Sequence, residues 1–552
     1  MRRPLALLCL LVVASLAAGA CASNDWNAYG YDSKHFSKQP SESALTPSAV
    51  QASLHVNFDF VIPSGTAGGG SVHSFTASPS VYNNVAYVGG LNGIFYAIFG
   101  TGSSKGTVKW QYPPATAAAA DGCGITTQPL VIATGSGNPS GPGISSSAAI
   151  VSGVPGHTRA VIFGAPDPTS NGGDGRVWAL DADTGQCIWK SAVIAPTSGT
   201  AKIGYSSPAI AHGRAYIGVS AKHPDNPITI GHLFAVNLAD GSLDPAFSFT
   251  ATNGPGGGGI WSSPAITPSG NVVVTSGNSC HNSIPSCASE PSVNLSLSMM
   301  KLDYTNGNVL WQLQPVPFAL DADPDWAAPP SVGQVSCGSL AMSVQKDGYV
   351  YAADIKTGGP FSNPACSSAG HSLECPRWSF PHVASLPFTG GTHTDTRWLR
   401  MPAVDGDRLY VYAGGPALDE SVPGHPASTS IRRMYSLDVC AADANRIRWI
   451  LDVPGFAPGA PSTANGVIYI GSDDGHLYAY GDTSILPPAS SVCSYPGLPA
   501  DLSCSGAGFQ PVGVPVQLKA VTISGSVPGV PAISNGQVYI ATTAGHLIGL
   551  TP

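Results

Sequence analysis

Four positions of this 552-residue chain carry side chains that could do chemistry together. The carboxylate of Asp325 can accept a proton or bind a hard cation. The amide of Asn278 offers a neutral oxygen of the kind that Ca²⁺ accepts, and the face of Trp261 can stack on a flat ring. Lys346 offers a cation for an anionic oxygen. Taken singly, each has an ordinary explanation as a turn former, a core ring or a surface charge, so only their joint placement can indicate a site.

The elements that position these residues are copies of one unit. Residues 177–189 and 300–311 follow the same phrase: an apolar strand ends in Asp, a Gly turn follows, and a Trp lies eight residues after the Asp. Repetition at this scale indicates one supersecondary unit copied about an axis.

Strand-turn-strand phrases recur eight times, most with a Pro-containing approach to the first strand. They begin near residues 75, 125, 205, 260, 337, 399, 459 and 529. Four-stranded sheets that are apolar on both faces must be buried between neighbours, as in a radial array. We therefore expect an all-β fold, an eight-bladed β-propeller of four-stranded antiparallel blades, formed by residues 21–552 as one domain with both termini in one blade.

Composition agrees with this fold and excludes some partners. Gly (66) and Pro (49) are abundant and charged residues are only 10%, which suits short strands joined by turns. The net charge of −8 comes with no basic stripe, so nucleic acid is not expected as a partner.

The N-terminus predicts export. Arg2 and Arg3 precede an apolar stretch and a small-residue cleavage site, so residues 1–20 are interpreted as a signal peptide that is too short to span a bilayer. Cys21 would then be the first mature residue, either a lipid anchor of lipoprotein type or a plain secreted terminus. Both alternatives place the protein in the periplasm or outside the cell.

The cysteines suit an oxidising compartment. Of 12 cysteines, ten remain beyond Cys9 and Cys21, an even number as expected for disulfides. The close pairs 280/287, 366/375 and 493/504 are predicted loop staples. The chain has no Cys-x-x-Cys-His motif, so no covalently bound haem is expected.

The phrase at 178–189 resembles the repeat of the pyrroloquinoline quinone (PQQ) propeller family, and the likeness extends over nearly all of the mature chain. The resemblance implies the propeller fold. It does not by itself imply activity, because the family includes propellers without quinone, such as outer-membrane assembly lipoproteins.

Segments of the middle repeats resemble the PQQ alcohol dehydrogenases more specifically, particularly the polyvinyl-alcohol dehydrogenase-like branch. Gly259-Ile-Trp-Ser-Ser-Pro and Thr275-Ser-Gly-Asn imply that Trp261 is the floor under the quinone and that Asn278 is a calcium ligand. Asp323-Pro-Asp implies that Asp325 is the catalytic base beside the metal. The hairpin at 345–354 implies that Lys346 holds the quinone oxygens.

Three positions depart from the family pattern. Where a metal-binding Glu is expected, the chain has Asn226 with Asp225 beside it, which keeps an oxygen ligand but changes the charge. Cys123 has no adjacent cysteine, so the family's strained vicinal disulfide ring cannot form. Ala327 stands where lanthanide-using members have a second Asp.

The N-terminus predicts export, and the resemblance implies an oxidoreductase that uses PQQ and calcium, oxidises an alcohol and passes electrons to an external acceptor. The alternative is a propeller of the same ancestry without cofactor that serves as a binding or assembly scaffold at the cell envelope. A third possibility is a surface-polymer-binding propeller that uses its loops.

Overall fold

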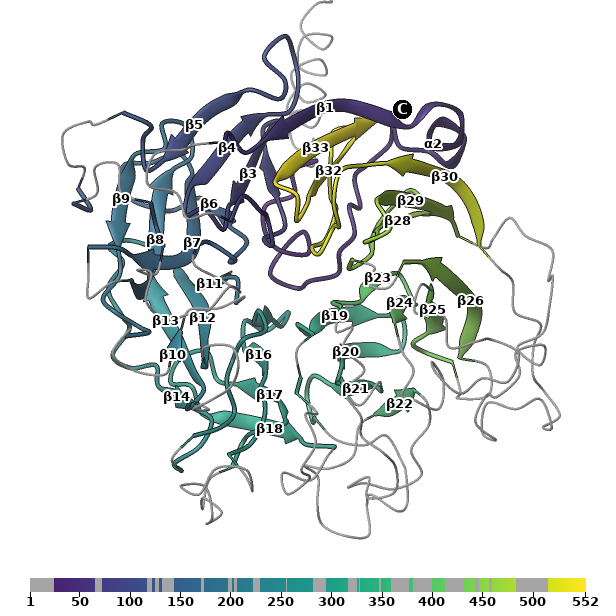
Figure 1. Cartoon of the computed structure of the whole chain (residues 1–552). Coiled ribbons are helices and arrows are strands. Elements are labelled where there is room, and N and C mark those ends of the chain that lie inside the picture. The colour runs from purple at the N-terminus through teal and green to yellow at the C-terminus, as the bar shows by residue number, and fades with distance from the viewer. Residues whose placement is uncertain are drawn as a thin grey trace, which may run out of the picture.

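The computed structural model describes most of the chain and shows a ring of β-sheets (Figure 1). The described residues are 24–64, 72–116, 122–124, 129–131, 143–169, 173–196, 201–202, 206–221, 229–254, 256–280, 294–315, 325–326, 328–346, 349–358, 377–380, 400–412, 431–441, 446–455, 459–482 and 515–552.

Eight antiparallel sheets form the blades of a β-propeller, as predicted. We number the blades in chain order. Blade 1 contains β2 (Ser80–Tyr82), β3 (Val85–Gly89), β4 (Phe95–Phe99) and β5 (Val108–Tyr112), and blade 2 contains β6 (Ala149–Val151), β7 (Ala160–Asp167), β8 (Asp174–Asp181) and β9 (Cys187–Lys190). Blade 3 contains β10 (Ala201–Lys202), β11 (Ala209–Ala211), β12 (Arg214–Ala221), β13 (His232–Asn237) and β14 (Phe249–Thr250). Blade 4 contains β15 (Ala265–Ile266), β16 (Val272–Thr275), β17 (Met299–Leu302) and β18 (Val309–Leu313).

Blades 5 to 8 complete the ring. Blade 5 contains β19 (Ser331–Val335), β20 (Gly338–Val344), β21 (Val350–Asp354) and β22 (Trp378–Phe380), and blade 6 contains β23 (Ala403–Asp405), β24 (Arg408–Tyr412), β25 (Ile431–Asp438) and β26 (Ile447–Pro454). Blade 7 contains β27 (Ser462–Ala464), β28 (Val467–Gly471), β29 (His476–Gly481) and β30 (Val516–Thr522). Blade 8 contains β31 (Ala532–Ser534), β32 (Gln537–Ala541) and β33 (His546–Thr551) together with β1 (His55–Val61).

An N-terminal strand and the C-terminal strand meet in blade 8, as expected from the sequence. β1 follows the helix α2 (Pro47–Ser53) and pairs antiparallel with β33, so an N-terminal strand completes a sheet built from the C-terminus. This pairing closes the ring. In the described ranges no helix is long and apolar enough to cross a membrane.

Two of the eight predicted blade starts were wrong. The innermost strand of blade 2 is β6, well after the predicted start near 125, and the sequence before it lacks the Pro found in most repeats. In blade 5 the predicted start at Cys337 is the turn into the second strand, because β19 had already begun at Ser331. In both cases the apolar residues alone did not distinguish the first strand of the blade from the segments before and after it.

The repeat phrase joins neighbouring blades where it occurs. Trp189 on the outer strand of blade 2 donates its indole N–H to the carbonyl of Leu238 in blade 3, 3.0 Å away. A Cβ on Gly241 would lie 2.6 Å from that indole ring, so the turn requires Gly. Trp311 and Gly358 repeat the arrangement between blades 4 and 5. The Trp and the Gly of the phrase are therefore partners across a blade interface.

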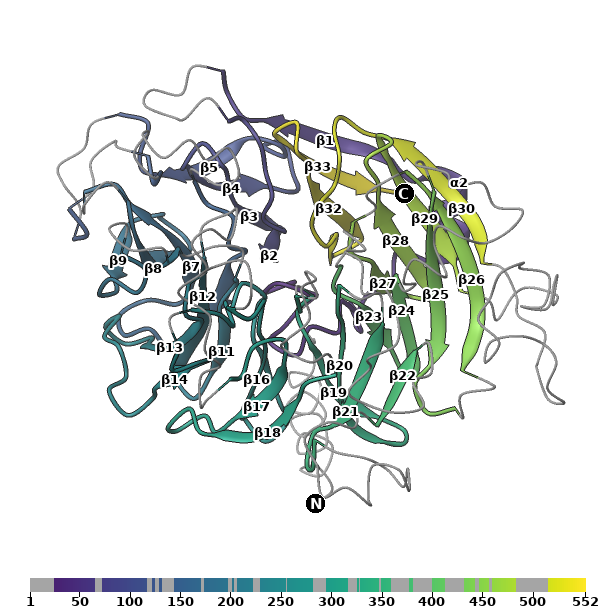
Figure 2. The same ribbon diagram turned by 60° about the horizontal axis from the view of Figure 1, so that its bottom comes forward.

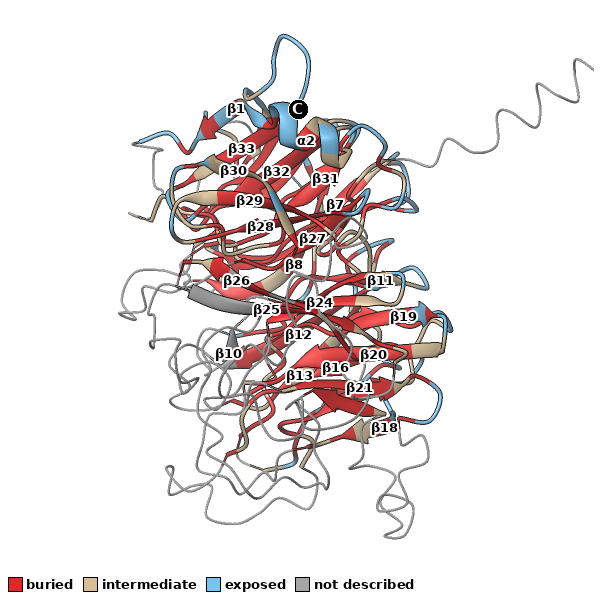
Figure 3. Ribbon diagram, turned by 90° about the vertical axis from the view of Figure 1, so that its right-hand side faces the viewer, coloured by how far each residue is buried: buried red, intermediate tan, exposed pale blue. Residues whose placement is uncertain are grey.

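Buried residues fill the blades, whereas exposed residues gather at turns and on α2 (Figure 3). Tight turns follow the predicted chemistry. Asn465 and Gly466 have φ of 51° and 74°, the paired left-handed conformation that joins β27 to β28.

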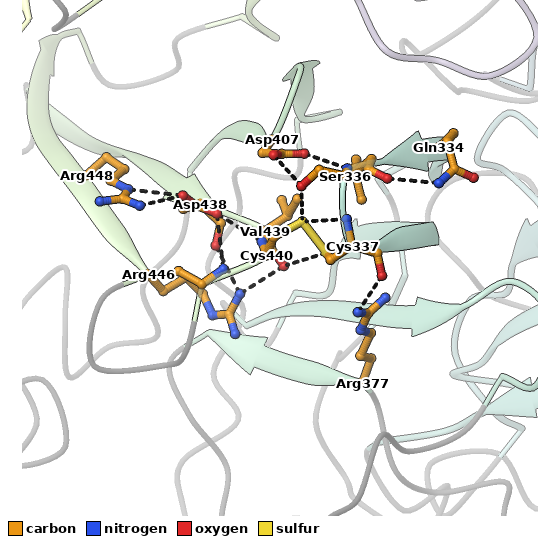
Figure 4. The surroundings of a disulfide bond; sticks show 12 residues. Gln334, Ser336, Cys337, Arg377, Asp407, Asp438, Val439, Cys440, Arg446 and Arg448 are labelled. Atoms are coloured by element: carbon orange, nitrogen blue, oxygen red, sulfur yellow. Dashed lines mark hydrogen bonds and ion pairs between the residues drawn. A yellow bond between two sulfur atoms is a disulfide. The ribbon is translucent and has the colours of Figure 1, made fainter.

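Two described disulfides join neighbouring blades. Cys123 pairs with Cys187 of β9, and Cys337 of blade 5 pairs with Cys440 of blade 6. Figure 4 shows that the second is reinforced by Asp407, which accepts hydrogen bonds from the backbone N–H and hydroxyl of Ser336. Cys280 is also disulfide-bonded, but the other cysteines of the three predicted staples lie outside the described residues, so those pairings stay predictions.

The segment 24–39, which we call the strap, crosses the propeller axis and contacts all eight blades (Figure 2). Its partner in each blade is the backbone of the second residue of the innermost strand. These partners are Val81, Ile150, Ile210, Ile266, Val332, Val404, Thr463 and Ile533. The repeat thus presents one equivalent hydrogen-bonding position per blade, and the strap uses every one.

Candidate functional site

Asp325 lies just before blade 5 and is almost fully buried, with 3% of the residue exposed. The next residue anchors it: the indole of Trp326 is fully buried and donates to the carbonyl of Leu297, 2.9 Å away. Leu297 in turn donates its N–H to the carbonyl of Gly277. The segment that carries Asp325 is therefore fastened to the β16–β17 connection of blade 4.

Asn278 contacts Asp325 twice. It follows β16, whose last residue is Thr275. Its backbone N–H donates to Asp325 Oδ1 at 2.5 Å and its side-chain Nδ2 donates to Oδ2 at 3.1 Å. The two residues come from adjacent blades, so blade packing sets this contact.

Lys346 supplies the counter-ion. It follows β20, and its Nζ lies 2.9 Å from Asp325 Oδ2, with the two side chains 14% and 4% exposed. Its backbone N–H also donates to the carbonyl of Asp325 at 3.0 Å. A charge-assisted hydrogen bond at this burial is stronger than a surface ion pair, and its donors stabilise the ionised carboxylate.

Trp261 completes the group. The Nζ of Lys346 lies over its ring, 5.8 Å from the centroid, which is a cation–π distance. A Cβ built on Gly277 would lie 2.6 Å from Asp325 Oδ1 and 3.2 Å from the indole nitrogen of Trp261. Indole, carboxylate and ammonium are thus neighbours around one glycine.

Four of the six expected site residues therefore meet at one place, between blades 4 and 5. The remaining two, Asp225 and Asn226, lie outside the described residues. No group of three or more His, Cys, Asp or Glu side chains that could hold a metal occurs within the described ranges.

Sequence reasoning missed Gly277 and Trp326 as parts of the site. Gly277 immediately precedes Asn278, and Trp326 immediately follows Asp325. The sequence showed both residues but not that their neighbours face each other across a blade interface. The strap was also missed, because its segment was expected only to precede blade 1.

Comparisons with known proteins agree with the architecture. Residues 140–359 match a PQQ-repeat family model described as outer membrane protein assembly factor BamB. That range contains the four site residues that meet. The matched range is less than half of the chain, whose architecture is that of an eight-bladed β-propeller.

Solved structures share the fold of this propeller at low sequence identity. The quinohemoprotein alcohol dehydrogenase from Comamonas testosteroni is 16% identical with a TM-score of 0.64, covering 97% of this chain and 82% of that one. The quinohemoprotein alcohol dehydrogenase from Pseudomonas putida HK5 is 15% identical with a TM-score of 0.60, covering 96% and 80%. A search of curated protein sequences finds no match to the chain. The likeness to the solved structures is one of fold.

Proposed function

We propose that this propeller is an exported PQQ-dependent alcohol dehydrogenase-like oxidoreductase that transfers hydride from an alcohol to its quinone. The observation that carries the proposal is the cluster around Asp325, in which a carboxylate, an amide, an ammonium and an indole meet at a blade interface. A structural ion pair needs neither the aromatic ring nor the glycine between them.

The residues present fit a flat anionic quinone. Trp261 is partly exposed and offers an aromatic surface, and Lys346 beside it offers a cation for a ring oxygen. When bound, PQQ supplies the two-electron oxidant that accepts the hydride. Trp261 would support its ring plane, and Lys346 would hold its oxygens.

Calcium is fitted less completely. Ca²⁺ takes about six to eight oxygen ligands. In the described part of the chain, Asp325 supplies carboxylate oxygens at this place, whereas Asn278 turns its amide nitrogen toward Asp325 Oδ2. We therefore derive no step through a metal, and calcium stays a prediction that depends on Asp225 and Asn226.

The chain's own residues support proton transfer. Asp325 would take the hydroxyl proton of the alcohol as hydride leaves the carbon, giving an aldehyde or ketone. Asn278 and Lys346 hold the carboxylate in one orientation, and Trp326 holds its backbone. This arrangement holds a buried carboxylate in one orientation, which is what general-base catalysis needs.

A second candidate function is an assembly or binding scaffold without cofactor. The description of the matching family model and the absence of a Glu at the Asp225–Asn226 position favour it. The two functions make different predictions for quinone binding.

The test is Asp325→Asn, with Asp240→Asn as a matched control on a turn of blade 3. We expect Asp325→Asn to abolish alcohol-dependent dye reduction while purified protein still binds PQQ, seen as bound-quinone absorbance in the presence of Ca²⁺. The control should leave both unchanged, because among the described residues Asp240 accepts hydrogen bonds from Ser242 of its own turn. Unchanged turnover in Asp325→Asn would remove Asp325 from the mechanism. Absence of quinone binding to the wild type at micromolar PQQ would favour the scaffold.

A further inference from the structure

The strap and the candidate site lie at opposite ends of the innermost strands. In blade 4, Ile266 donates its N–H to the carbonyl of Ser33 in the strap, 2.7 Å away. Trp261 precedes Ile266 by five residues of approach to the same strand. At about 3.3 Å per extended residue, this separates site and strap by at most roughly 16 Å of chain.

Blade 5 shows the same polarity. Val332 donates to the carbonyl of Lys34 in the strap, whereas Asp325 lies seven residues earlier. Lys346 follows β20, which runs antiparallel to β19 and returns toward the site. We call the end with the strap the strap face and the other end the site face.

The strap fills its end of the axis with buried side chains. Trp26, Ser37 and Gln39 are at most 1% exposed, and His35 is 2% exposed. Aromatic rings pack edge to face within it, with Trp26 against Tyr31 at 5.4 Å between centroids.

Glycines of the strap and of blade 5 show how closely it fits. A Cβ on Gly333 of β19 would lie 2.4 Å from the ring of Phe36, and one on Gly30 would lie 2.5 Å from Met401 Cε. Gly30 also has φ of 63°, a conformation that L side chains rarely adopt. The strap is therefore a fitted part of the core, and its bonds to all eight blades leave it continuous around the axis.

We propose that the strap closes the central channel at one face, so that every molecule that reaches the Asp325 cluster arrives from the site face. This proposal rests on the proposed function, which identifies the two molecules as the alcohol and the electron acceptor. Both would reach the site from the same face. The acceptor is then a diffusible electron carrier that approaches from the site face, and two electrons leave the protein for each alcohol oxidised. Because the alcohol and the acceptor use one approach, we expect each to slow the binding of the other.

Seating of the strap, on which closure depends, is tested by hydrogen exchange, which needs no activity. The amides of Ile266, Val332 and Val404 donate to strap carbonyls. We expect them to be strongly protected in the wild type and to exchange at least tenfold faster in Gly30→Val, while the amides of the β3–β4 ladder stay protected. Fast exchange of these amides in the wild type would overturn closure.

A milder variant guards against global unfolding. If Gly30→Val also exposes the β3–β4 amides, Gly333→Ala replaces it, because its Cβ displaces only the Phe36 ring. Selective loss of protection at the strap partners supports the proposal. Unaltered protection in both variants would show that other groups protect these amides and would overturn it.

The direction of approach is tested with one bulky group placed on either face. Ala544, in the turn between β32 and β33, is exposed on the site face, and Ser152, after β6, is exposed on the strap face. Each is changed to Cys and coupled to a polyethylene glycol maleimide, with identically treated wild type as control. We expect the adduct on Ala544→Cys to slow PQQ binding and turnover with cytochrome c at least threefold, and the adduct on Ser152→Cys to leave both unchanged.

If the Ser152→Cys adduct slows PQQ binding and turnover, or if neither adduct slows them, the shared approach is overturned. Failure of the proposed function looks different: unlabelled wild type would bind no PQQ at all, while hydrogen exchange would still report whether the strap is seated.

Discussion

Gly277→Ala is the sharpest perturbation of the candidate site, because its effect falls on the functional groups. The backbone at Gly277 is not in the left-handed region, so alanine meets no conformational penalty there. Its Cβ would lie 2.6 Å from Asp325 Oδ1, about 0.8 Å short of the 3.4 Å at which ordinary van der Waals contact begins. The carbonyl of Gly259 and the indole nitrogen of Trp261, both at 3.2 Å, hinder escape to the other side.

The carboxylate must therefore shift by most of an ångström and lose its short bond from the Asn278 N–H. A misplacement of about 1 Å in a catalytic group costs roughly a hundredfold in rate. We expect kcat/KM for the alcohol to fall about a hundredfold in Gly277→Ala, equivalent to about 2.7 kcal/mol of transition-state stabilisation. PQQ should still bind, since Lys346 and the partly exposed Trp261 remain.

The assay compares turnover, quinone binding and thermal unfolding with those of Gly481→Ala. Gly481 ends β29, and a Cβ there makes only ordinary contacts, the nearest at 3.5 Å to Leu518. That control should behave as wild type. If Gly277→Ala retains full turnover with an unchanged KM, the carboxylate either tolerates displacement or takes no part in the reaction, and the reasoning fails.

Three further outcomes are expected. Lys346→Gln removes the ammonium that faces the buried carboxylate of Asp325. The free energy of unfolding, measured by chemical denaturation at neutral pH, should fall by about 3 kcal/mol. A change below about 0.5 kcal/mol would show that solvent screens the pair. Burial lowers the pKa of His35 from 6.5 to about 4, so between these pH values the unfolded state binds a proton that the folded state does not. The free energy of unfolding should therefore fall by about 3 kcal/mol as the pH drops from about 6.5 to about 4. In His35→Asn, which tolerates the same φ of 59°, this pH dependence should disappear. Replacing Cys337 and Cys440 together by Ser opens a cross-link over 103 residues and should lower stability by about 3 to 4 kcal/mol under non-reducing conditions, whereas under reducing conditions wild type and variant should agree.

Much of the fold was predictable because it repeats. The Asp-Gly-Trp phrase at 177–189 indicated a unit that needs neighbours, and the structure shows the neighbour in the Trp189–Leu238 bond. Closure by β1 and β33 also followed from the pattern. The blade boundaries near 125 and 337 were wrong, since strand propensity does not distinguish the innermost strand from an adjacent apolar run.

The candidate site divides in the same way. The identities of Trp261, Asn278, Asp325 and Lys346 were visible in the sequence because each lies in a recognisable segment. That they would touch was not, because their contacts cross the interface between blades 4 and 5, and residues 47 positions apart meet only when two sheets pack. Asp225 and Asn226 keep their predicted role as calcium ligands, outside the described residues.

The sequence by itself determined the kind of unit, the number of its copies and the candidate chemistry, since local patterns of strand, turn and docking Trp are written residue by residue. Only the tertiary structure decided that Gly277 lies between carboxylate and indole, and that the first described residues become a strap across the axis. Both depend on distances between segments remote in sequence, which are set by ring closure and blade packing rather than by local propensity.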